Sequence, residues 1–333
     1  MVQPDPKLSQ LISALKDGDV VSGETLGRAL GMSRAGAWKQ LQKLEELGLP
    51  VERVRGVGYR IPGGLDLLSE AEIMRHLTGW RDGGSGSLAI SVHGVVDSTN
   101  RVAARCLEAD PANRGRFHVA ECQTAGKGRR GRSWLSPYGA SIYLSVAWRF
   151  DGGVAAVVGL SLAVGVAMRR AIRRATGIEV QLKWPNDLLA QRKKLGGILV
   201  ELVGDPSDSC RAVVGVGINV RTPCAVATAI EQPWINLDEV TDQPVARNLL
   251  AAAMIHELHL LLASYGPGAF AAYREEWLQG DGFAGATVTL STPSQSTTGV
   301  ARGVDDTGAL LLEREGRLEV FSGGELSLRV ANA

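Results

Sequence analysis

A basic, glycine-rich segment places the strongest constraint on how this chain of 333 residues can fold. Residues 121–138 interleave glycine with lysine and arginine, and Gly126–Gly131 matches the Gly-x-Gly-x-x-Gly dinucleotide fingerprint. That fingerprint requires a helix to begin at once, so that the helix N-terminus meets a pyrophosphate. Here Pro137 and Gly139 follow instead, and residues 140–148 alternate like a strand. The segment therefore predicts a loop that leads into a sheet and disfavours a Rossmann fold.

The same segment has the composition of an anion-binding loop. Glycine lets the main chain approach a ligand closely, and lysine and arginine attract phosphate or carboxylate oxygens. A solvated basic turn remains the alternative interpretation, because runs of charge usually face water.

Composition limits the classes of function. The chain is 45% hydrophobic and 21% charged, which is typical of a globular protein with a large core. Its net charge is only +1, so any binding of nucleic acid must depend on local patches. The four cysteines lack metal or redox spacing, and the apolar run Val154–Met168 is short and rich in small residues. Since no apolar leader is visible either, we expect a cytoplasmic protein without a membrane segment.

The N-terminal residues 5–61 have the pattern of a winged helix-turn-helix. Helical spacing of leucines is followed by a helix over Gly23–Leu30 with Ser22 as its N-cap, and by a helix over Arg34–Leu47 with Ser33 as its N-cap. A hairpin wing over Val51–Ile61 comes next, with Arg53, Arg55 and Arg60 expected to be exposed. The alternative use of such a unit is protein contact. The residues predicted to face DNA are Ser33, Arg34, Trp38, Lys39, Lys43 and Arg55.

The rest of the chain divides into two parts after a predicted hinge at Pro62–Gly64. As far as about Gly280, strands mix with helices, which predicts an α+β unit with a substantially antiparallel sheet. One long helix is predicted over Val154–Thr176. From Phe283 to Val330, short strands separated by Gly and Asp predict a small β-barrel or sandwich.

Short polar motifs lie between the predicted elements. Asp97–Asn100 closes a strand and opens a helix, where such side chains either cap the helix or bind a polar ligand. Lys183–Asp187 (Lys-Trp-Pro-Asn-Asp) has ordinary turn residues that also suit a nucleotide and its Mg²⁺. Lys194 is followed by two glycines, and Val214–Val220 contains two more, so a ligand can approach the main chain there.

Taken in order, these motifs resemble the biotin–protein ligase family over nearly the whole chain. The resemblance rests on the basic glycine loop, on Lys183–Asp187 and on the Lys-Leu-Gly-Gly-Ile-Leu-Val-Glu strand, Lys194–Glu201. The N-terminal unit also resembles the DNA-binding domain of bifunctional members, and Gly323–Arg329 resembles the end of the C-terminal domain. The implied fold is α+β with three domains: a winged helix-turn-helix over 1–62, a mixed α/β ligase domain over 63–281 and a small SH3-like β-barrel over 282–333.

The resemblance implies two activities. The chain would be an ATP-dependent ligase that forms biotinyl-5′-AMP from biotin and ATP with Mg²⁺. It would then transfer biotin to a lysine of the biotin carboxyl carrier protein of acetyl-CoA carboxylase. It would also repress biotin-synthesis genes at their operator DNA, as a homodimer when the adenylate is bound. A ligand-sensing repressor without ligase activity remains the alternative, and a lipoate ligase is a lesser one that the winged helix and C-terminal barrel disfavour.

The resemblance also implies roles for individual residues. The catalytic set would be Lys194, Arg129, Lys183 and Asp187, with no metal site built from protein ligands alone. Lys127 stands where the family pattern has arginine, so the charge is kept without the planar fork. Loop 221–233 has little resemblance to the family, although it and the basic loop would order over the adenylate. The residues implied to bind biotin and the adenylate are Ser98, Thr99, Asn100, Gln123, Gly126, Lys127, Gly128, Arg129, Trp134, Lys194, Gly197, Asn219 and Trp234.

Overall fold

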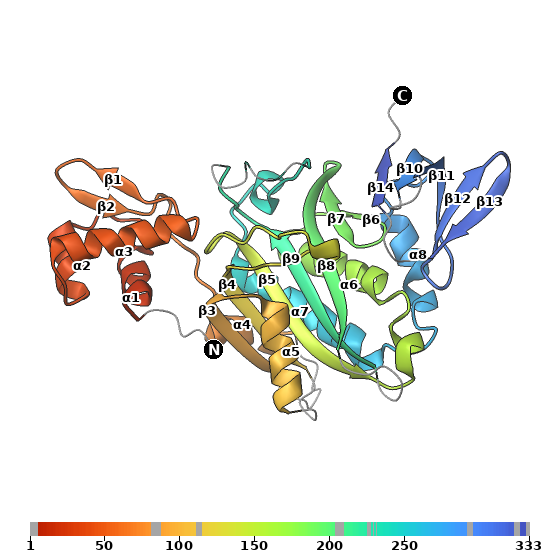
Figure 1. Cartoon of the computed structure of the whole chain (residues 1–333), viewed down its shortest axis with the longest axis horizontal. Coiled ribbons are helices and arrows are strands. Elements are labelled where there is room, and N and C mark those ends of the chain that lie inside the picture. Colours follow the sequence, from red (N-terminus) through yellow and green to blue (C-terminus); the bar gives the residue numbers. More distant parts are fainter. Residues whose placement is uncertain are drawn as a thin grey trace.

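The computed structural model contains three units in a row, with the N-terminal helices at one end and the last strands at the other (Figure 1). It describes residues 6–80, 88–110, 115–203, 210–224, 228, 230, 232–291, 296–322 and 327–330.

The N-terminal unit is the predicted winged helix-turn-helix. The Ser22 hydroxyl accepts a hydrogen bond from the Thr25 N–H at 3.1 Å, and the Ser33 hydroxyl accepts one from the Gly36 N–H at 3.2 Å. Both predicted N-caps are therefore confirmed. The elements are α1 (Pro6–Leu15), α2 (Gly23–Ala29), α3 (Arg34–Glu46) and the wing strands β1 (Glu52–Val54) and β2 (Gly58–Arg60).

The central unit is built on a seven-stranded sheet in the order β3-β4-β5-β9-β8-β7-β6. Only β3 and β4 run parallel, so the predicted antiparallel character is confirmed. The strands are β3 (Ala89–Val96), β4 (Arg116–Gln123), β5 (Ser141–Phe150), β6 (Gln181–Lys183), β7 (Asp187–Ala190), β8 (Lys193–Val203) and β9 (Cys210–Asn219).

Helices cover both faces of this sheet, because successive side chains of a strand point to opposite faces. Leu144 and Val146 of β5 join the large core under α6 and α7, whereas Ala147 joins Ala103 and Leu107 of α5 on the other face. The helices are α4 (Glu70–Thr78), α5 (Thr99–Ala109), α6 (Leu160–Thr176), α7 (Arg247–Ser264) and α8 (Ala271–Gly280).

The single helix predicted over residues 154–176 is wrong. The chain forms a short 3₁₀ turn at Gly153–Val157 and then α6, with a break at Gly159, whose φ is +72°. A Cβ atom at Gly159 would lie 2.6 Å from the Cβ of Phe270, so glycine provides both the turn and the space. Gly153–Thr176 is apolar and long enough for a membrane span, yet most of α6 is buried in the core beneath the sheet.

The C-terminal unit is a five-stranded antiparallel sheet in the order β13-β12-β11-β10-β14, which confirms the predicted small β-domain. Trp184 of the ligase unit is buried and donates its indole N–H to the Gly308 carbonyl at 3.0 Å, which joins the two units. Residues 323–326 of the C-terminal motif lie outside the described residues. The strands are β10 (Thr287–Ser291), β11 (Ser296–Val304), β12 (Leu310–Arg314), β13 (Arg317–Phe321) and β14 (Ser327–Val330).

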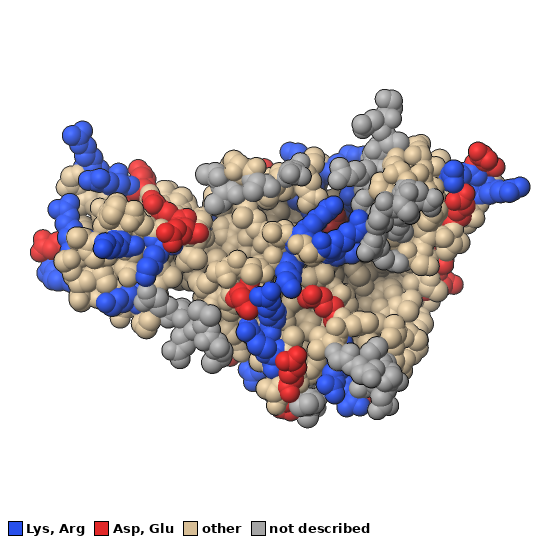
Figure 2. Space-filling view, in the orientation of Figure 1, with Lys and Arg blue, Asp and Glu red and all other residues tan. Residues whose placement is uncertain are grey.

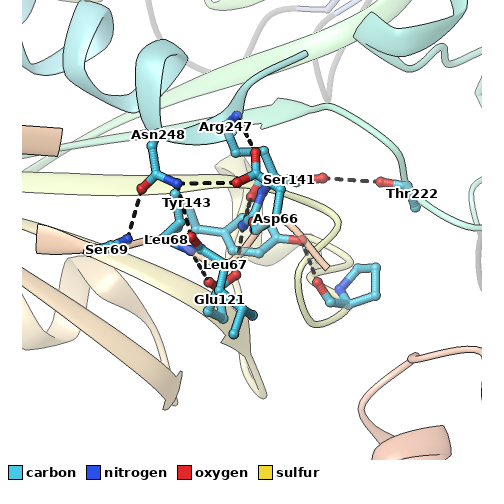
Figure 3. A network of polar contacts seen from close by, with 11 residues as sticks. Asp66, Leu67, Leu68, Ser69, Glu121, Ser141, Tyr143, Thr222, Arg247 and Asn248 are labelled. Atoms are coloured by element: carbon cyan, nitrogen blue, oxygen red, sulfur yellow. Dashed lines mark hydrogen bonds and ion pairs between the residues drawn. The ribbon is translucent and has the colours of Figure 1, made fainter. Parts of the chain in front are cut away.

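The segment after the predicted hinge is held in place by buried polar contacts (Figure 3). Arg247, at the start of α7, is fully buried and pairs with Glu121 of β4, their Nη2 and Oε2 atoms being 2.7 Å apart. Its Nη1 donates to the Asp66 carbonyl at 2.6 Å, and the Leu68 N–H donates to Glu121 Oε1. The linker is thus bonded to the ligase core.

The winged helix also contacts the loop next to the sheet directly. The Tyr138 N–H donates to the carbonyl of Leu47, the C-cap residue of α3, at 2.9 Å. Tyr138 and Cys122 pack with the apolar core of the N-terminal unit. The third helix is therefore connected to the chain segment that follows the basic glycine loop.

Candidate functional site

A cavity of about 390 Å³ lies where the basic glycine loop, the start of α5 and the β7–β8 hairpin meet. Figure 2 shows Lys and Arg side chains gathered across the middle of this face of the molecule. Asp187 is the one carboxylate among the described residues that line the cavity. The cavity is therefore suited to a strongly anionic ligand. The cationic residues that line it are Lys127, Arg129, Arg130, Arg132, Lys183, Arg192 and Lys194.

One end of the cavity is polar but uncharged. The parallel pairing of β3 with β4 sets Val96 opposite Gln123, so the start of α5 lies beside the end of β4. Gln123 Oε1 accepts hydrogen bonds from the Thr99 N–H at 2.8 Å and from the Thr99 hydroxyl at 3.1 Å. Ser98, Thr99 and Asn100 are all buried and all line the cavity. This end presents neutral donors and acceptors of the kind that hold an amide or urea group.

Ser145 belongs to this polar end, although the sequence did not single it out. Its Oγ lies 2.7 Å from Thr99 Oγ1 and 2.6 Å from Asn100 Oδ1. A Cβ atom at Gly215 would lie 2.1 Å from Asn100 Oδ1, so glycine is required there. The signal available in the sequence was a hydroxyl residue within the apolar alternation of β5.

Trp134 forms part of the wall of the cavity. It lies against the glycines of two neighbouring strands, since a Cβ atom at Gly217 would be 2.7 Å and one at Gly197 3.2 Å from its ring. Its buried indole nitrogen has no hydrogen-bond partner among the described residues. Lys194 Nζ lies 5.5 Å from the centroid of the same ring. The glycines of β8 and β9 therefore make room for a flat aromatic wall beside a cation.

An ion-pair cluster lies next to Trp134. Lys194 Nζ lies 2.7 Å from Asp187 Oδ1, and Lys183 Nζ lies 3.9 Å from Asp187 Oδ2. All three side chains are largely enclosed. Asp187 thus holds two lysines at the cavity.

The basic glycine loop closes on itself as a tight hairpin. The Gly128 N–H donates to the Arg132 carbonyl at 2.7 Å, and the Trp134 N–H donates to the Gly126 carbonyl at 2.9 Å. Arg129 turns inward and donates to Asn186 Oδ1 at 3.3 Å. Burial lowers the pKa of Arg129, which nevertheless remains a cation. The loop thereby delivers a half-buried guanidinium to the Lys183–Asp187 motif.

The predicted site residues are brought together with three exceptions. Gly126, Asn219 and Trp234 do not line the cavity in the described structure. Gly126 supports the loop, because a Cβ atom there would lie 2.6 Å from the Trp134 carbonyl. Asn219 is buried at the end of β9, and Trp234 pairs as a bridge with Lys194. Lining residues absent from the predicted set include Arg130, Arg132, Ser145, Asn186, Arg192 and Phe283.

A second polar surface lies on the winged helix. Arg34, Lys39 and Lys43 are exposed on α3, and Trp38 of the same helix is 47% exposed. Arg55 is exposed in the wing, and the Ser33 side chain caps α3. The Arg60 side chain, predicted to be exposed, is 41% exposed and pairs with Glu52 at 2.7 Å across the β1–β2 hairpin.

Each of the three units matches a known protein family or domain. Residues 92–219 match the model of the biotin/lipoate A/B protein ligase family, residues 7–60 match an HTH domain, and residues 283–329 match the biotin protein ligase C-terminal domain. The bifunctional ligase/repressor BirA of Escherichia coli is 41% identical over 322 residues, which are 97% of each chain. This chain belongs to the bifunctional biotin–protein ligase/repressor family.

A more distant relative and a solved structure are similar to this chain as well. The bifunctional ligase/repressor BirA of Bacillus subtilis is 32% identical and covers 91% of this chain and 93% of its own. A biotin protein ligase from Aquifex aeolicus, solved in complex with biotin, has a TM-score of 0.62 at 27% identity. It covers 73% of this chain and 99% of its own. The predicted ligase fold with an added DNA-binding unit is confirmed.

Proposed function

We propose that this biotin–protein ligase activates biotin with ATP in the cavity beneath Trp134, and that Lys194 is the central catalytic residue. The observation that carries the proposal is the position of Lys194. Its ammonium group lies between the Trp134 ring and Asp187, with neutral polar groups on one side and further cations on the other. A carboxylate and a phosphate can meet there beside one positive charge.

The neutral end matches the ureido ring of biotin. Ser98, Thr99, Asn100 and Gln123 offer hydroxyl and amide groups, which suit a neutral ring with both donors and acceptors. Trp134 offers an apolar face to the carbon skeleton. The side chain of biotin would then direct its carboxylate to Lys194.

The reaction brings two anions together. A carboxylate oxygen of biotin attacks the α-phosphorus of ATP, the bond to the β-phosphate bridging oxygen breaks, and pyrophosphate leaves with that electron pair. Lys194, Arg129 and Lys127 offset the repulsion between the anions. An amine of the carrier-protein lysine then attacks the acyl carbon of biotinyl-5′-AMP and expels AMP, so the enzyme need not supply a nucleophile.

We propose that Mg²⁺ binds together with ATP. Mg²⁺ usually binds phosphate oxygens and water with one or two carboxylates. Asp187 is the carboxylate placed to take part, and the described residues contain no cluster of three or more His, Cys, Asp or Glu side chains that could hold a metal. The metal would neutralise charge on the phosphates.

We further propose that biotinyl-5′-AMP controls repression. The α3 surface and the wing would contact operator DNA of biotin-synthesis genes through Arg34, Lys39 and Arg55. A homodimer of the adenylate-bound protein would place two such surfaces on a palindromic operator. The Tyr138–Leu47 hydrogen bond supports communication between the ligand loop and α3.

The test is release of pyrophosphate on incubation with ATP, Mg²⁺ and biotin. The parent protein is expected to release it, and Lys194→Ala is expected to abolish release without unfolding. Lys193→Ala is the matched control, because Lys193 is the adjacent exposed residue and does not line the cavity. No release by the parent, together with biotin-dependent DNA binding, would favour the sensor-only repressor. Normal release by Lys194→Ala would remove Lys194 from the chemistry.

A further inference from the structure

The tip of the β7–β8 hairpin has an unusual backbone conformation. Gln191 and Arg192 form its two-residue turn, with φ values of +49° and +60°. Both angles lie in the left-handed region, which glycine and asparagine adopt more readily than glutamine or arginine. Hairpin turns of this primed type match the twist of the strands, but they favour Asn-Gly. A residue with a long cationic side chain therefore occupies a position where glycine is easier to accommodate.

The turn directs Arg192 toward the cavity. Its guanidinium carbon lies 5.8 Å from the centroid of the Phe283 ring, and both residues line the cavity. Lys183 Nζ lies 5.8 Å from the same centroid. Phe283 itself is only 7% exposed, so the ring is a fixed platform for two cations. Within the described part of the chain, Arg192 forms no ion pair that would neutralise it.

A chain of contacts shows which end of the cavity this is. Trp134 lies next to Lys194, Lys194 pairs with Asp187, and Asp187 faces Lys183. Lys183 lies over Phe283, which also carries Arg192. Arg192 is thus at the opposite end from the neutral polar groups proposed to hold the ureido ring.

The number of phosphates in each ligand indicates which group the cations at this end of the cavity bind. Biotinyl-5′-AMP keeps a single phosphate, whose charge Lys194 and Arg129 are placed to neutralise. ATP carries two more phosphates, which leave as pyrophosphate and need cations of their own. Lys183 and Arg192 are cations beyond Asp187 in this series of contacts, and a guanidinium binds phosphate oxygens with two parallel donors.

We infer that Arg192, supported on Phe283, binds the β- and γ-phosphates of ATP and the departing pyrophosphate. This inference rests on the proposed adenylation and adds a substrate-binding residue to it. It also gives Phe283, which leads into the C-terminal unit, a direct part in forming the nucleotide site.

Arg192→Gly is the variant that tests this assignment. Glycine adopts the positive φ readily, so the variant removes the guanidinium without straining the turn. Gln191→Gly is the matched control, because it changes the same turn in the same way but leaves Arg192 in place. Both variants are compared with the parent as full-length proteins.

Three measurements distinguish the outcomes. Calorimetric titration with inorganic pyrophosphate and Mg²⁺ needs no catalysis, and Arg192→Gly should bind pyrophosphate about tenfold or more weakly. The KM for ATP in adenylation should rise by a similar factor. Binding of presynthesised biotinyl-5′-AMP, and biotin transfer from it, should be unchanged because that ligand lacks the two phosphates.

Unchanged pyrophosphate binding in Arg192→Gly would overturn the assignment. An equal loss of biotinyl-5′-AMP binding would overturn it too, because it would indicate a general disturbance of the cavity. A parent protein that binds pyrophosphate but forms no adenylate would contradict the proposed function and leave the Arg192 comparison valid.

Discussion

Replacing Arg247 with methionine tests how the linker between the DNA-binding and ligase units is held. Arg247 is fully buried, and its Nη2 donates to Glu121 Oε2 at 2.7 Å and to the Ser141 carbonyl at 2.8 Å. Its Nη1 donates to the Asp66 carbonyl at 2.6 Å (Figure 3). Methionine fills part of the same volume without a charge. The substitution therefore leaves a buried carboxylate and two carbonyls without these donors.

The size of the effect follows from the burial of the pair. Glu121 is 3% exposed and Arg247 is 0% exposed, so water cannot replace the lost partner. Removing one member of a buried ion pair costs about 3–5 kcal/mol of unfolding free energy. Adding Glu121→Gln should restore roughly half of that loss, because no unpaired charge remains buried. The glutamine oxygen can still accept the Leu68 N–H that now donates to Glu121 Oε1.

Urea unfolding of the parent, Arg247→Met and the double variant measures these differences. Arg302→Met is the control, since the Arg302–Glu313 pair is exposed and should contribute less than about 1 kcal/mol. A loss below about 1 kcal/mol in Arg247→Met would refute the reasoning. So would a double variant that is as unstable as the single one.

The remaining predictions concern pH, the aromatic wall and DNA. Burial lowers the pKa of His118 to about 4, below its ordinary value near 6.5. As the pH falls, the His118 imidazole therefore takes up a proton in the unfolded chain before it does so in the folded protein. Stability should therefore fall as pH drops from about 6.5 to 4, and His118→Gln should flatten that slope in urea unfolding at several pH values. Gly217→Ala puts a methyl group 2.7 Å from the Trp134 ring and should weaken biotin binding at least about tenfold in calorimetric titration, with the fold kept. Arg34→Ala should reduce the salt dependence of operator binding by about one unit of log–log slope in gel-shift titrations, without altering pyrophosphate release.

Each of these has an outcome that contradicts it. An unchanged pH slope in His118→Gln would mean that other groups control acid stability. Gly266→Ala is the control for the aromatic wall, since an added Cβ atom there has nothing within 4 Å, and equal biotin affinity in both glycine variants would contradict the packing argument. An unchanged salt slope in Arg34→Ala would place the DNA surface elsewhere.

Much of the secondary structure was accessible from sequence because its signals are local. A serine N-cap bonds to an amide three residues along the chain, so Ser22 and Ser33 located α2 and α3 correctly. The break before α6 was missed, because the need for glycine at position 159 comes from Phe270, which packs there from far along the chain. The ion pair between Arg60 and Glu52 was missed for a similar reason, since Glu52 is on the other wing strand.

The order of residues along the chain settles which chemical groups this ligase has: a loop rich in cations and glycine, a lysine before two glycines, and capped helices with basic residues. Hydrogen bonds, turns and caps act over a few residues, so they can be inferred without a fold. The arrangement of those groups depends on strand order, which places β9 between β5 and β8. That order brings Ser145 to Asn100 and sets Trp134 against Gly197 and Gly217. Contacts between such distant positions form only when the whole sheet is assembled. Their free energy comes from burial of side chains, which no single segment achieves alone.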